Sequence, residues 1–241
     1  MNILMIDTSG PACGVAIARE GRLVCDMQLV SGRTHSQRVM PMVEAALAMS
    51  DMAVSDIDVF GAVTGPGSFT GVRIGVSSVK ALAHAAGRPC VGVDALHALA
   101  ANIQAFDGVV CPILDARAQQ VYGAMFRAGD VPQRLCGDEA MPLTAFLDRV
   151  EATDERALFL GDGVAAMRGA IEARLGGRAQ FAAPQHMNLR AGSACAIAMR
   201  LAEQGETTDY LHLLPLYLRA PQAERERAAK LAAQQKEEAH G

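Results

Sequence analysis

The stretch "ILMIDTSGPACGVAIA", residues 3–18, decides the fold. It holds two apolar runs separated by a turn of small residues, and the first run ends at Asp7. A third apolar run follows the tight turn at residues 20–21. Short apolar runs bounded by turn residues are typical of strands joined by hairpin connections. The pattern therefore predicts three successive strands, over residues 2–7, 13–19 and 22–30.

Helices and strands then alternate through the first half of the chain. "THSQRVMPMVEAALAMS" begins with a T-x-x-Q capping box at Thr34 and predicts a helix, in which Pro41 marks a kink or a late first turn. The glycine-rich turn "GPGSFTGVRIG", residues 65–75, separates the next predicted strand and helix. Apolar periodicity predicts the strands over 57–64 and 90–93, and the helices over about 70–87 and 94–105.

The same order restarts in the second half. "GVVCPILDAR", residues 108–117, repeats the plan of the first strand and ends with Asp115 near its close. The further predicted strands cover residues 119–129, 133–141 and 157–161, and the further helices cover 142–150, 162–176 and 191–204. We expect an α/β protein of two βββαβα halves, with lobes over residues 1–106 and 107–220 and a charged tail over 221–241. The tail is either an ordinary solvated helix or frayed end, or a segment that orders on a partner.

Composition excludes several classes of protein. The chain has 241 residues, 51% of them hydrophobic, and no apolar run approaches the roughly 20 residues that span a bilayer. A formal net charge of −4 and the absence of tryptophan argue against a protein that grips nucleic acid unaided. The six cysteines show no C-x-x-C pattern, which favours buried, reduced thiols and a cytoplasmic location.

The turn after the first strand has two interpretations. Asp7, Thr8 and Ser9 could hold a phosphate with hydroxyl and backbone N–H groups, with a magnesium ion bound to Asp7 through water. Alternatively, this is a polar hairpin turn whose side chains satisfy local backbone groups. The residues alone leave both interpretations open.

The duplicated plan resembles the actin, sugar-kinase and Hsp70 ATPase (ASKHA) superfamily. In that superfamily one hairpin turn from each half pinches the phosphates, and a Gly-Gly turn holds the adenosine. Here Arg117 stands where active members keep a glycine in the second turn, and its bulk should occupy the nucleotide's space. Asp162 places a charge between the two glycines of the third turn. The resemblance implies a degenerate nucleotide site at Asp7, Thr8, Ser9, Asp115, Arg117, Gly161 and Gly163.

No catalytic or metal-binding set can be assembled from the spacing. The six histidines form no H-x-x-x-H or H-x-E-x-H pair that would place two imidazoles on one helical face. Ser68 is followed by Phe69, Thr70 and Gly71, so it does not lie in a G-x-S-x-G nucleophile elbow. We therefore expect neither a metal site nor a serine hydrolase.

The glycine-rich turn fails as a nucleotide motif, because no G-K-[ST] follows it and Thr70 replaces the last glycine of G-x-G-x-x-G. Ser68 or Thr70 can cap the helix that follows. Gly71 and Gly75 lie four residues apart in that helix, and each costs roughly 1 kcal/mol relative to alanine. Such a cost is consistent with the close approach of another backbone, which is either this chain's own sheet or a partner's helix.

Six segments together resemble the TsaB (YeaZ) family. They are "ILMIDTSGPACGVAIA", "THSQRVMPMVEAAL", "GPGSFTGVRIGVSSVKALA", "GVDALHALA", "ILDARAQQVYGAMF" and "LPLYLRAP", which span most of residues 1–220. The resemblance implies a non-catalytic dimerisation subunit of the bacterial complex that makes threonylcarbamoyladenosine at position 37 of tRNAs. Its implied partners are TsaD and TsaE, with tRNA bound only through the complex and a homodimer possible when the chain is alone. No cofactor is expected on the isolated chain, because ATP or ADP and metal are expected on TsaD and TsaE.

The resemblance also implies that the helices near 34–49 and 70–87 dock TsaD. The residues chosen on these helices are Arg33, His35, Arg38, Val39, Met42, Phe69, Val72, Arg73, Gly75 and Val76. An active ATP-binding enzyme of the same superfamily, retaining Asp7, Thr8 and Ser9, is the alternative. A metallopeptidase is a second and weaker alternative, because the sequence lacks a pair of histidines spaced to bind a metal ion.

Overall fold

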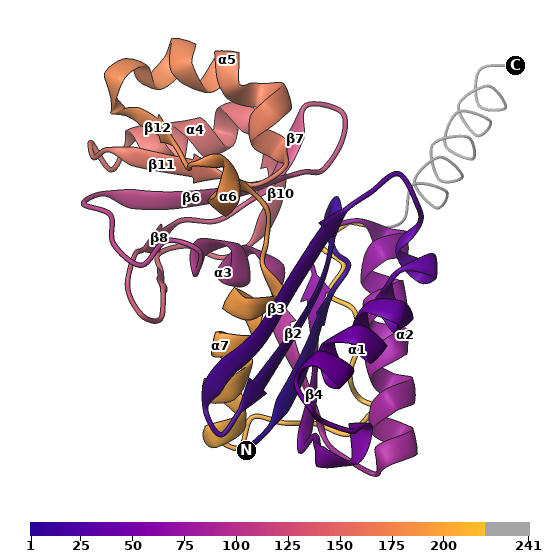
Figure 1. Cartoon of the computed structure of the whole chain (residues 1–241). Helices are drawn as coiled ribbons and strands as arrows, with labels where there is room; N and C mark the ends of the chain where they lie inside the picture. Colours follow the sequence, from indigo (N-terminus) through magenta and orange to yellow (C-terminus); the bar gives the residue numbers. More distant parts are fainter. Residues whose placement is uncertain (220–241) are drawn as a thin grey trace, which may run out of the picture.

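The first lobe is built on a five-stranded mixed sheet (Figure 1). The structure, a computed structural model, describes residues 1–219. The strands are β1 (Ile3–Asp7), β2 (Ala12–Arg19), β3 (Arg22–Val30), β4 (Val59–Gly65) and β5 (Cys90–Asp94). Their order is β3-β2-β1-β4-β5, with the first three antiparallel and β4 and β5 parallel to β1. The three strands predicted over residues 2–30 are confirmed.

The second lobe repeats this topology. Its main path runs β10-β7-β6-β11-β12, which has the same pattern of neighbours as the first sheet. These strands are β6 (Val109–Asp115), β7 (Gln120–Gly123), β10 (Glu139–Pro142), β11 (Ala157–Leu160) and β12 (Ala179–Phe181). Again the first three pair antiparallel and the last two run parallel to the first. The predicted duplication of an ASKHA-type half is confirmed.

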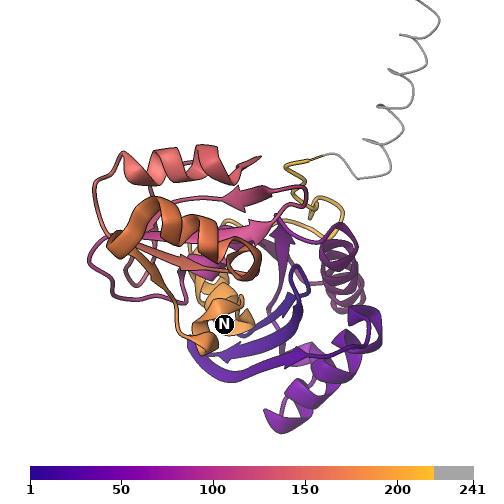
Figure 2. The ribbon, with the colours of Figure 1, turned by 90° about the horizontal axis from the view of Figure 1, so that it is seen from above.

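Alternating side chains of the first sheet supply two cores. Leu4, Ile6, Val15 and Ile17 pack under α1 (Val39–Met49) and α2 (Phe69–Ala86), whereas Ile3, Met5, Ala16 and Ala18 pack under α3 (Ala95–Ala100) and α7 (Ala191–Glu203). This follows from the two-residue period of a strand, which sends successive side chains to opposite faces. Figure 2 shows the two pairs of helices on opposite sides of the strands. In the second lobe, α4 (Leu143–Glu151) and α5 (Gly163–Leu175) pack on the sheet in a third core.

The chain returns to the first lobe after the second sheet. Helix α7 contacts β1, β2 and β3, although it lies within residues 107–220, the range predicted for the second lobe. It reaches them through a connection that includes the short helix α6 (Pro184–Met187). Two segments therefore cross between the lobes, one after α3 and one before α7.

The predicted capping box at Thr34 is wrong. Residues His35–Gln37 form a 3₁₀ turn, and α1 begins only at Val39. The Thr34 Oγ1 atom lies 3.1 Å from Ser36 Oγ and caps nothing. Pro41 therefore falls in the first turn of α1, where its missing N–H leaves no intrahelical bond unmade.

Several other boundaries differ from the prediction. The predicted strand 119–129 is divided into β7 and the two-residue β8 (Phe126–Arg127), which pairs with β9 (Gln133–Arg134). Helix α3 ends at Ala100, earlier than the predicted residue 105. The prediction missed the short elements β12 and α6, which have too few residues for an apolar period to be visible.

Candidate functional site

The turn between β1 and β2 is closed by its own side chains. Asp7, Thr8 and Ser9 are 1%, 1% and 2% exposed. The Asp7 Oδ1 atom accepts hydrogen bonds from Ser9 N at 2.8 Å and from Ser9 Oγ at 2.7 Å. Burial raises the pKa of Asp7 to about 6, although the bonds from Ser9 act in the opposite direction. The local hairpin interpretation therefore accounts for Asp7 and Ser9.

The start of α2 holds the same turn from outside. Thr8 Oγ1 donates to the Gly71 carbonyl oxygen at 2.7 Å, and Ser68 N donates to the Ser9 carbonyl oxygen at 2.8 Å. His35 Nε2 lies 2.9 Å from the Gly10 carbonyl oxygen. Ser68 also caps α2 by accepting from Gly71 N, as predicted. The hydroxyl groups of Thr8 and Ser9 and the backbone N–H of Ser9, which could hold a phosphate, thus already donate hydrogen bonds within the chain.

The second turn, between β6 and β7, has an unusual backbone. Arg117, Ala118 and Gln119 have φ values of 65°, 52° and 58°, respectively, all in the left-handed region that non-glycine residues seldom occupy. The Arg117 side chain is 82% exposed and lies 3.4 Å from Asp115 Oδ2. It therefore stands at the rim of the space between the lobes, with its charge opposed by Asp115, and does not fill that space as expected.

The third turn is tied to the second. Asp162 Oδ1 accepts from Asp115 N at 3.0 Å, and burial raises the pKa of Asp162. A Cβ atom at Gly161 would lie 2.1 Å from the Ile113 carbonyl oxygen, and Gly161 has a φ of 108°. Gly161 is therefore required by packing against β6, whatever it once did for a ligand.

The three turns surround a cavity between the lobes. Its volume is about 640 Å³, and its walls include Ser9, Ser68, Asp115, Arg117 and Asp162. At its base, between the turns that carry Asp7 and Asp162, a separate space of only about 10 Å³ remains. That volume accommodates about one water molecule. The buried carboxyl group of Asp7 and the partly buried one of Asp162, beside so small a space, are unfavourable to a polyphosphate.

Half of the residues chosen for partner binding belong to the protein's own core. Val39, Met42, Val72, Gly75 and Val76 are buried. Phe69 and Arg73 are exposed at the start of α2, with Arg73 5.3 Å from the Phe69 ring centroid, and Arg33 is exposed before the 3₁₀ turn. His35 and Arg38 are partly buried. These five side chains are therefore packed inside this chain, and the partner-binding role of all ten chosen residues stays a prediction.

The two glycines of α2, Gly71 and Gly75, explain why this side of the helix is buried. A Cβ atom at Gly75 would lie 2.6 Å from Thr8 Oγ1, and one at Gly71 would lie 2.1 Å from the Thr8 carbonyl oxygen. The close approach that the glycines permit is thus to the turn after β1 of the same chain, which favours packing on this chain's own sheet as the reason for the row.

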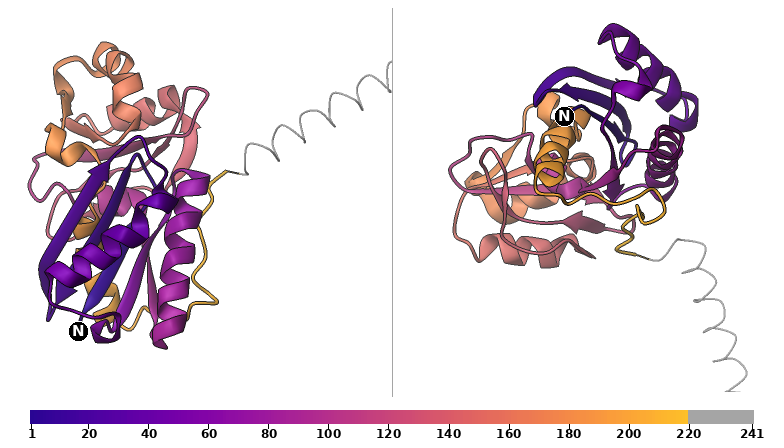
Figure 3. Two further views of the ribbon diagram at one scale, coloured as in Figure 1. Left: turned by 45° about the vertical axis from the view of Figure 1, so that its right-hand side comes forward. Right: turned by 90° about the horizontal axis from the view of Figure 1, so that it is seen from below.

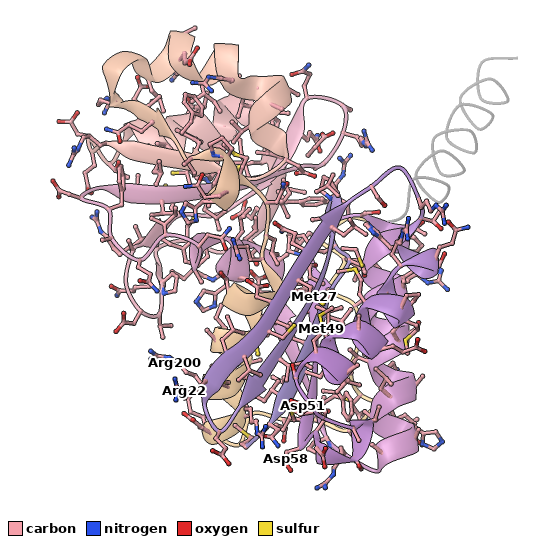
Figure 4. The ribbon with its side chains drawn as sticks, in the orientation of Figure 1. Arg22, Met27, Met49, Asp51, Asp58 and Arg200 are labelled. Atoms are coloured by element: carbon pink, nitrogen blue, oxygen red, sulfur yellow. The ribbon has the colours of Figure 1, made fainter. Side chains whose placement is uncertain are left out.

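The exposed side of α1 and α2 carries a row of arginine, serine and alanine residues and two methionines. Arg73, Ser77, Ala81 and Ala85 recur every four residues along α2 and are exposed. Met49 of α1, labelled in Figure 4, is 78% exposed, and Met40 is 37% exposed. The prediction included Arg73 but missed Ser77, Ala81 and Ala85, although their four-residue spacing was visible in the sequence. We call these six residues the outer face.

Neither metal ligands nor a membrane span is found in the described part of the chain. Within residues 1–219, no three His, Cys, Asp or Glu side chains are grouped so that they could bind a metal ion. Over the same residues, no helix combines the length and the apolar character needed to cross a bilayer. All six cysteines are free thiols, and burial raises the pKa of Cys13 and of Cys90 to about 11.

Comparison of the sequence with known proteins finds a matching family model and curated relatives. Residues 29–227 match the family model described as "TsaD: tRNA N6-adenosine threonylcarbamoyltransferase". The chain is 35% identical over 225 residues to the tRNA threonylcarbamoyladenosine biosynthesis protein TsaB of Bacillus subtilis, covering 93% of this chain and 96% of that one. It is 39% identical to the Escherichia coli protein of the same name over 53% of this chain and 55% of the other.

The fold has a solved counterpart as well. A crystal structure titled "YeaZ from Pseudomonas aeruginosa" superposes with a TM-score of 0.72 at 28% identity, covering 90% of this chain and 99% of the other. The Bacillus subtilis relative matches over nearly its whole length, and the shared topology extends through both lobes. The chain therefore belongs to the TsaB (YeaZ) family of tRNA threonylcarbamoyladenosine biosynthesis proteins.

Proposed function

We propose that this chain is a non-catalytic subunit that binds and stabilises TsaD. Together with TsaE, the pair supports transfer of a threonylcarbamoyl group to N6 of adenosine 37 in tRNAs. TsaD and TsaE hold the nucleotide and the metal, and tRNA is bound only through the complex. Family membership supports the pathway, and the state of the three turns supports a role without catalysis.

The observation that carries the proposal is the contrast between the turns and the outer face. Asp7, Thr8 and Ser9 are buried and bonded within the chain. In contrast, the outer face exposes Met40 and Met49 on α1 and the small residues Ser77, Ala81 and Ala85 on α2. Small side chains allow a second helix to pack close to the first, and methionine adapts its shape to a partner's surface.

A homodimer would use the same face when the chain is alone. The outer face has the apolar and small residues that a two-fold pair of helices needs, and C2 pairs use one patch on both copies. TsaD, which the resemblance places in the same superfamily, would replace the second copy. The two assemblies are therefore mutually exclusive in this proposal.

The test is a titration of TsaD with the chain and two arginine variants. Ala81→Arg places a long charged side chain in the middle of the outer face, and we expect it to weaken TsaD binding at least about tenfold. Ala170→Arg makes the same change on the exposed surface of α5 in the other lobe. It should bind TsaD like the unsubstituted chain. Equal affinities for the Ala81 variant and the unsubstituted chain would remove the outer face from the interface.

A further inference from the structure

The last described residues run back along the first lobe as an extended segment (Figure 3). Thr208 and Cys90 exchange backbone hydrogen bonds of 2.8 and 2.7 Å. Lys80 Nζ donates to the carbonyl oxygens of Leu211 and Leu213 at 3.3 Å, and Leu213 is only 3% exposed. The segment is therefore attached beside α2 before it reaches the space between the lobes.

The segment is next fixed at the end of β4. Leu216 N donates to the Thr64 carbonyl oxygen at 2.8 Å. A Cβ atom at Gly65 would lie 2.6 Å from the Leu216 carbonyl oxygen, so only glycine permits this approach. The rings of Tyr217 and Phe69 lie 4.7 Å apart. Up to Tyr217, every one of these contacts is to the first lobe.

Arg219 then reaches the second lobe. Its Nη1 atom donates to the Ala116 carbonyl oxygen at 2.7 Å, in the turn between β6 and β7. Ala116 N in turn donates to the Gln120 carbonyl oxygen at 3.0 Å, so the turn that Arg219 holds is closed on itself. Leu216, Tyr217, Leu218 and Arg219 all line the 640 Å³ cavity. The segment thus bridges the two lobes along one wall of the cavity.

The connection between the lobes provides the matching fixed point. Asn102 Nδ2 donates to the carbonyl oxygens of His186 and Asn188 at 3.0 and 2.8 Å, and Asn102 Oδ1 accepts from Ser193 Oγ at 2.7 Å. Asn102 therefore binds the two crossing segments to each other. The lobes also share one core, in which Leu99 of α3 lies with Leu114 and Leu160 of the second lobe. The contact of Arg219 is made across the cavity, away from this core.

We propose that residues 213–219, which we call the strap, connect the two lobes. The hydrogen bond from Arg219 to the Ala116 carbonyl oxygen holds the lobes at a fixed separation along the cavity. In a nucleotide-binding member of the superfamily, a ligand contacts a turn from each lobe. Here a guanidinium group of the chain itself connects β4 and α2 of one lobe to the β6–β7 turn of the other. A hydrogen bond from a charged donor is stronger than one between neutral groups, which suits a single contact to this role. The inference is independent of TsaD binding.

Three variants of the full chain test the role of the hydrogen bond between Arg219 and Ala116. Arg219→Ala removes the donor, and Arg219→Lys keeps a charged donor on a flexible side chain. Arg88→Ala is the matched control, because Arg88 is an exposed arginine whose carboxylate partner, Asp58, lies 3.9 Å away in the same lobe. The measurements are hydrogen exchange of the amides of residues 114–120 and the radius of gyration from solution scattering.

We expect exchange in residues 114–120 to be about tenfold faster in the Arg219→Ala variant, together with a larger radius of gyration. The Arg219→Lys variant should recover at least half of both changes, and Arg88→Ala should match the unsubstituted chain in both. An Arg219→Ala variant that matches the unsubstituted chain in either measurement would overturn the proposal. The proposal would also be overturned if Arg88→Ala increased the exchange rate and the radius of gyration as much as Arg219→Ala does.

Discussion

Asp7 shows how a residue of a phosphate-binding turn can be retained without a phosphate. It is buried, it accepts two hydrogen bonds from Ser9, and its pKa is raised to about 6. The sequence could identify the turn and its polar residues. It could not show that these residues satisfy one another, because that depends on the burial of β1 beneath α2 and on contacts from residues 68 and 71.

The raised pKa of Asp7 has a consequence for stability. The folded state keeps a proton on Asp7 up to about pH 6, whereas the ordinary aspartate pKa of 3.8 applies when the chain is unfolded. The folded state therefore binds more protons between these pH values, so the free energy of unfolding falls as pH rises through them. Asp7→Asn removes this titration, and we expect it to stabilise the protein at pH 7 by up to roughly 3 kcal/mol relative to its effect at pH 4.

Urea unfolding of both proteins from pH 4 to pH 7 measures this difference. The curve for Asp7→Asn should be flatter than that of the unsubstituted chain. If the free energies of unfolding of the two proteins change equally with pH over this range, the pKa of Asp7 is not raised by folding.

Helix α2 separates what periodicity can and cannot predict. Its residue range, its Ser68 cap and its glycine spacing were all readable in the sequence. Which side of the helix faces the sheet was not, because Gly71 and Gly75 are compatible with any close neighbour. The contacts of both glycines with Thr8 assign that side to this chain's own core. Val72, Gly75 and Val76 lie on this buried side, whereas Phe69 and Arg73 are exposed. The partner-binding role of all five remains a prediction.

Gly75 and Gly169 provide a matched pair of helix glycines. A Cβ atom at Gly75 would meet Thr8 Oγ1 at 2.6 Å, whereas one at Gly169 of α5 would meet nothing within 4 Å. We therefore expect Gly75→Ala to destabilise the fold by about 1–3 kcal/mol through overpacking. Gly169→Ala should stabilise it by up to about 1 kcal/mol through helix propensity.

Denaturant midpoints at constant slope distinguish the two effects. Two stabilising alanines would place Gly75 on an open surface and restore the partner interpretation of the row. For the same reason we expect the larger substitution Gly75→Leu to prevent folding.

At the scale of the molecule, the duplicated order of strands was predictable from two apolar runs that end in aspartate. The return of α7 to the first lobe was not, because nothing in its amphipathic pattern indicates which sheet it covers. The cavity between the lobes depends on this return, since the segment after α7 leads to the strap. A sequence therefore predicts the halves of such a fold better than the contacts between them.

The turns that bind nucleotide in the superfamily are closed in this chain by their own side chains, and we propose that the outer face of α1 and α2 binds the partner instead. The calorimetric titration of the isolated chain with Mg-ATP tests this claim most directly. We predict no measurable heat of binding up to millimolar nucleotide, for the unsubstituted chain and for Asp7→Ala alike. Micromolar binding of Mg-ATP that is lost on Asp7→Ala would contradict the account and favour an active ATP-binding enzyme.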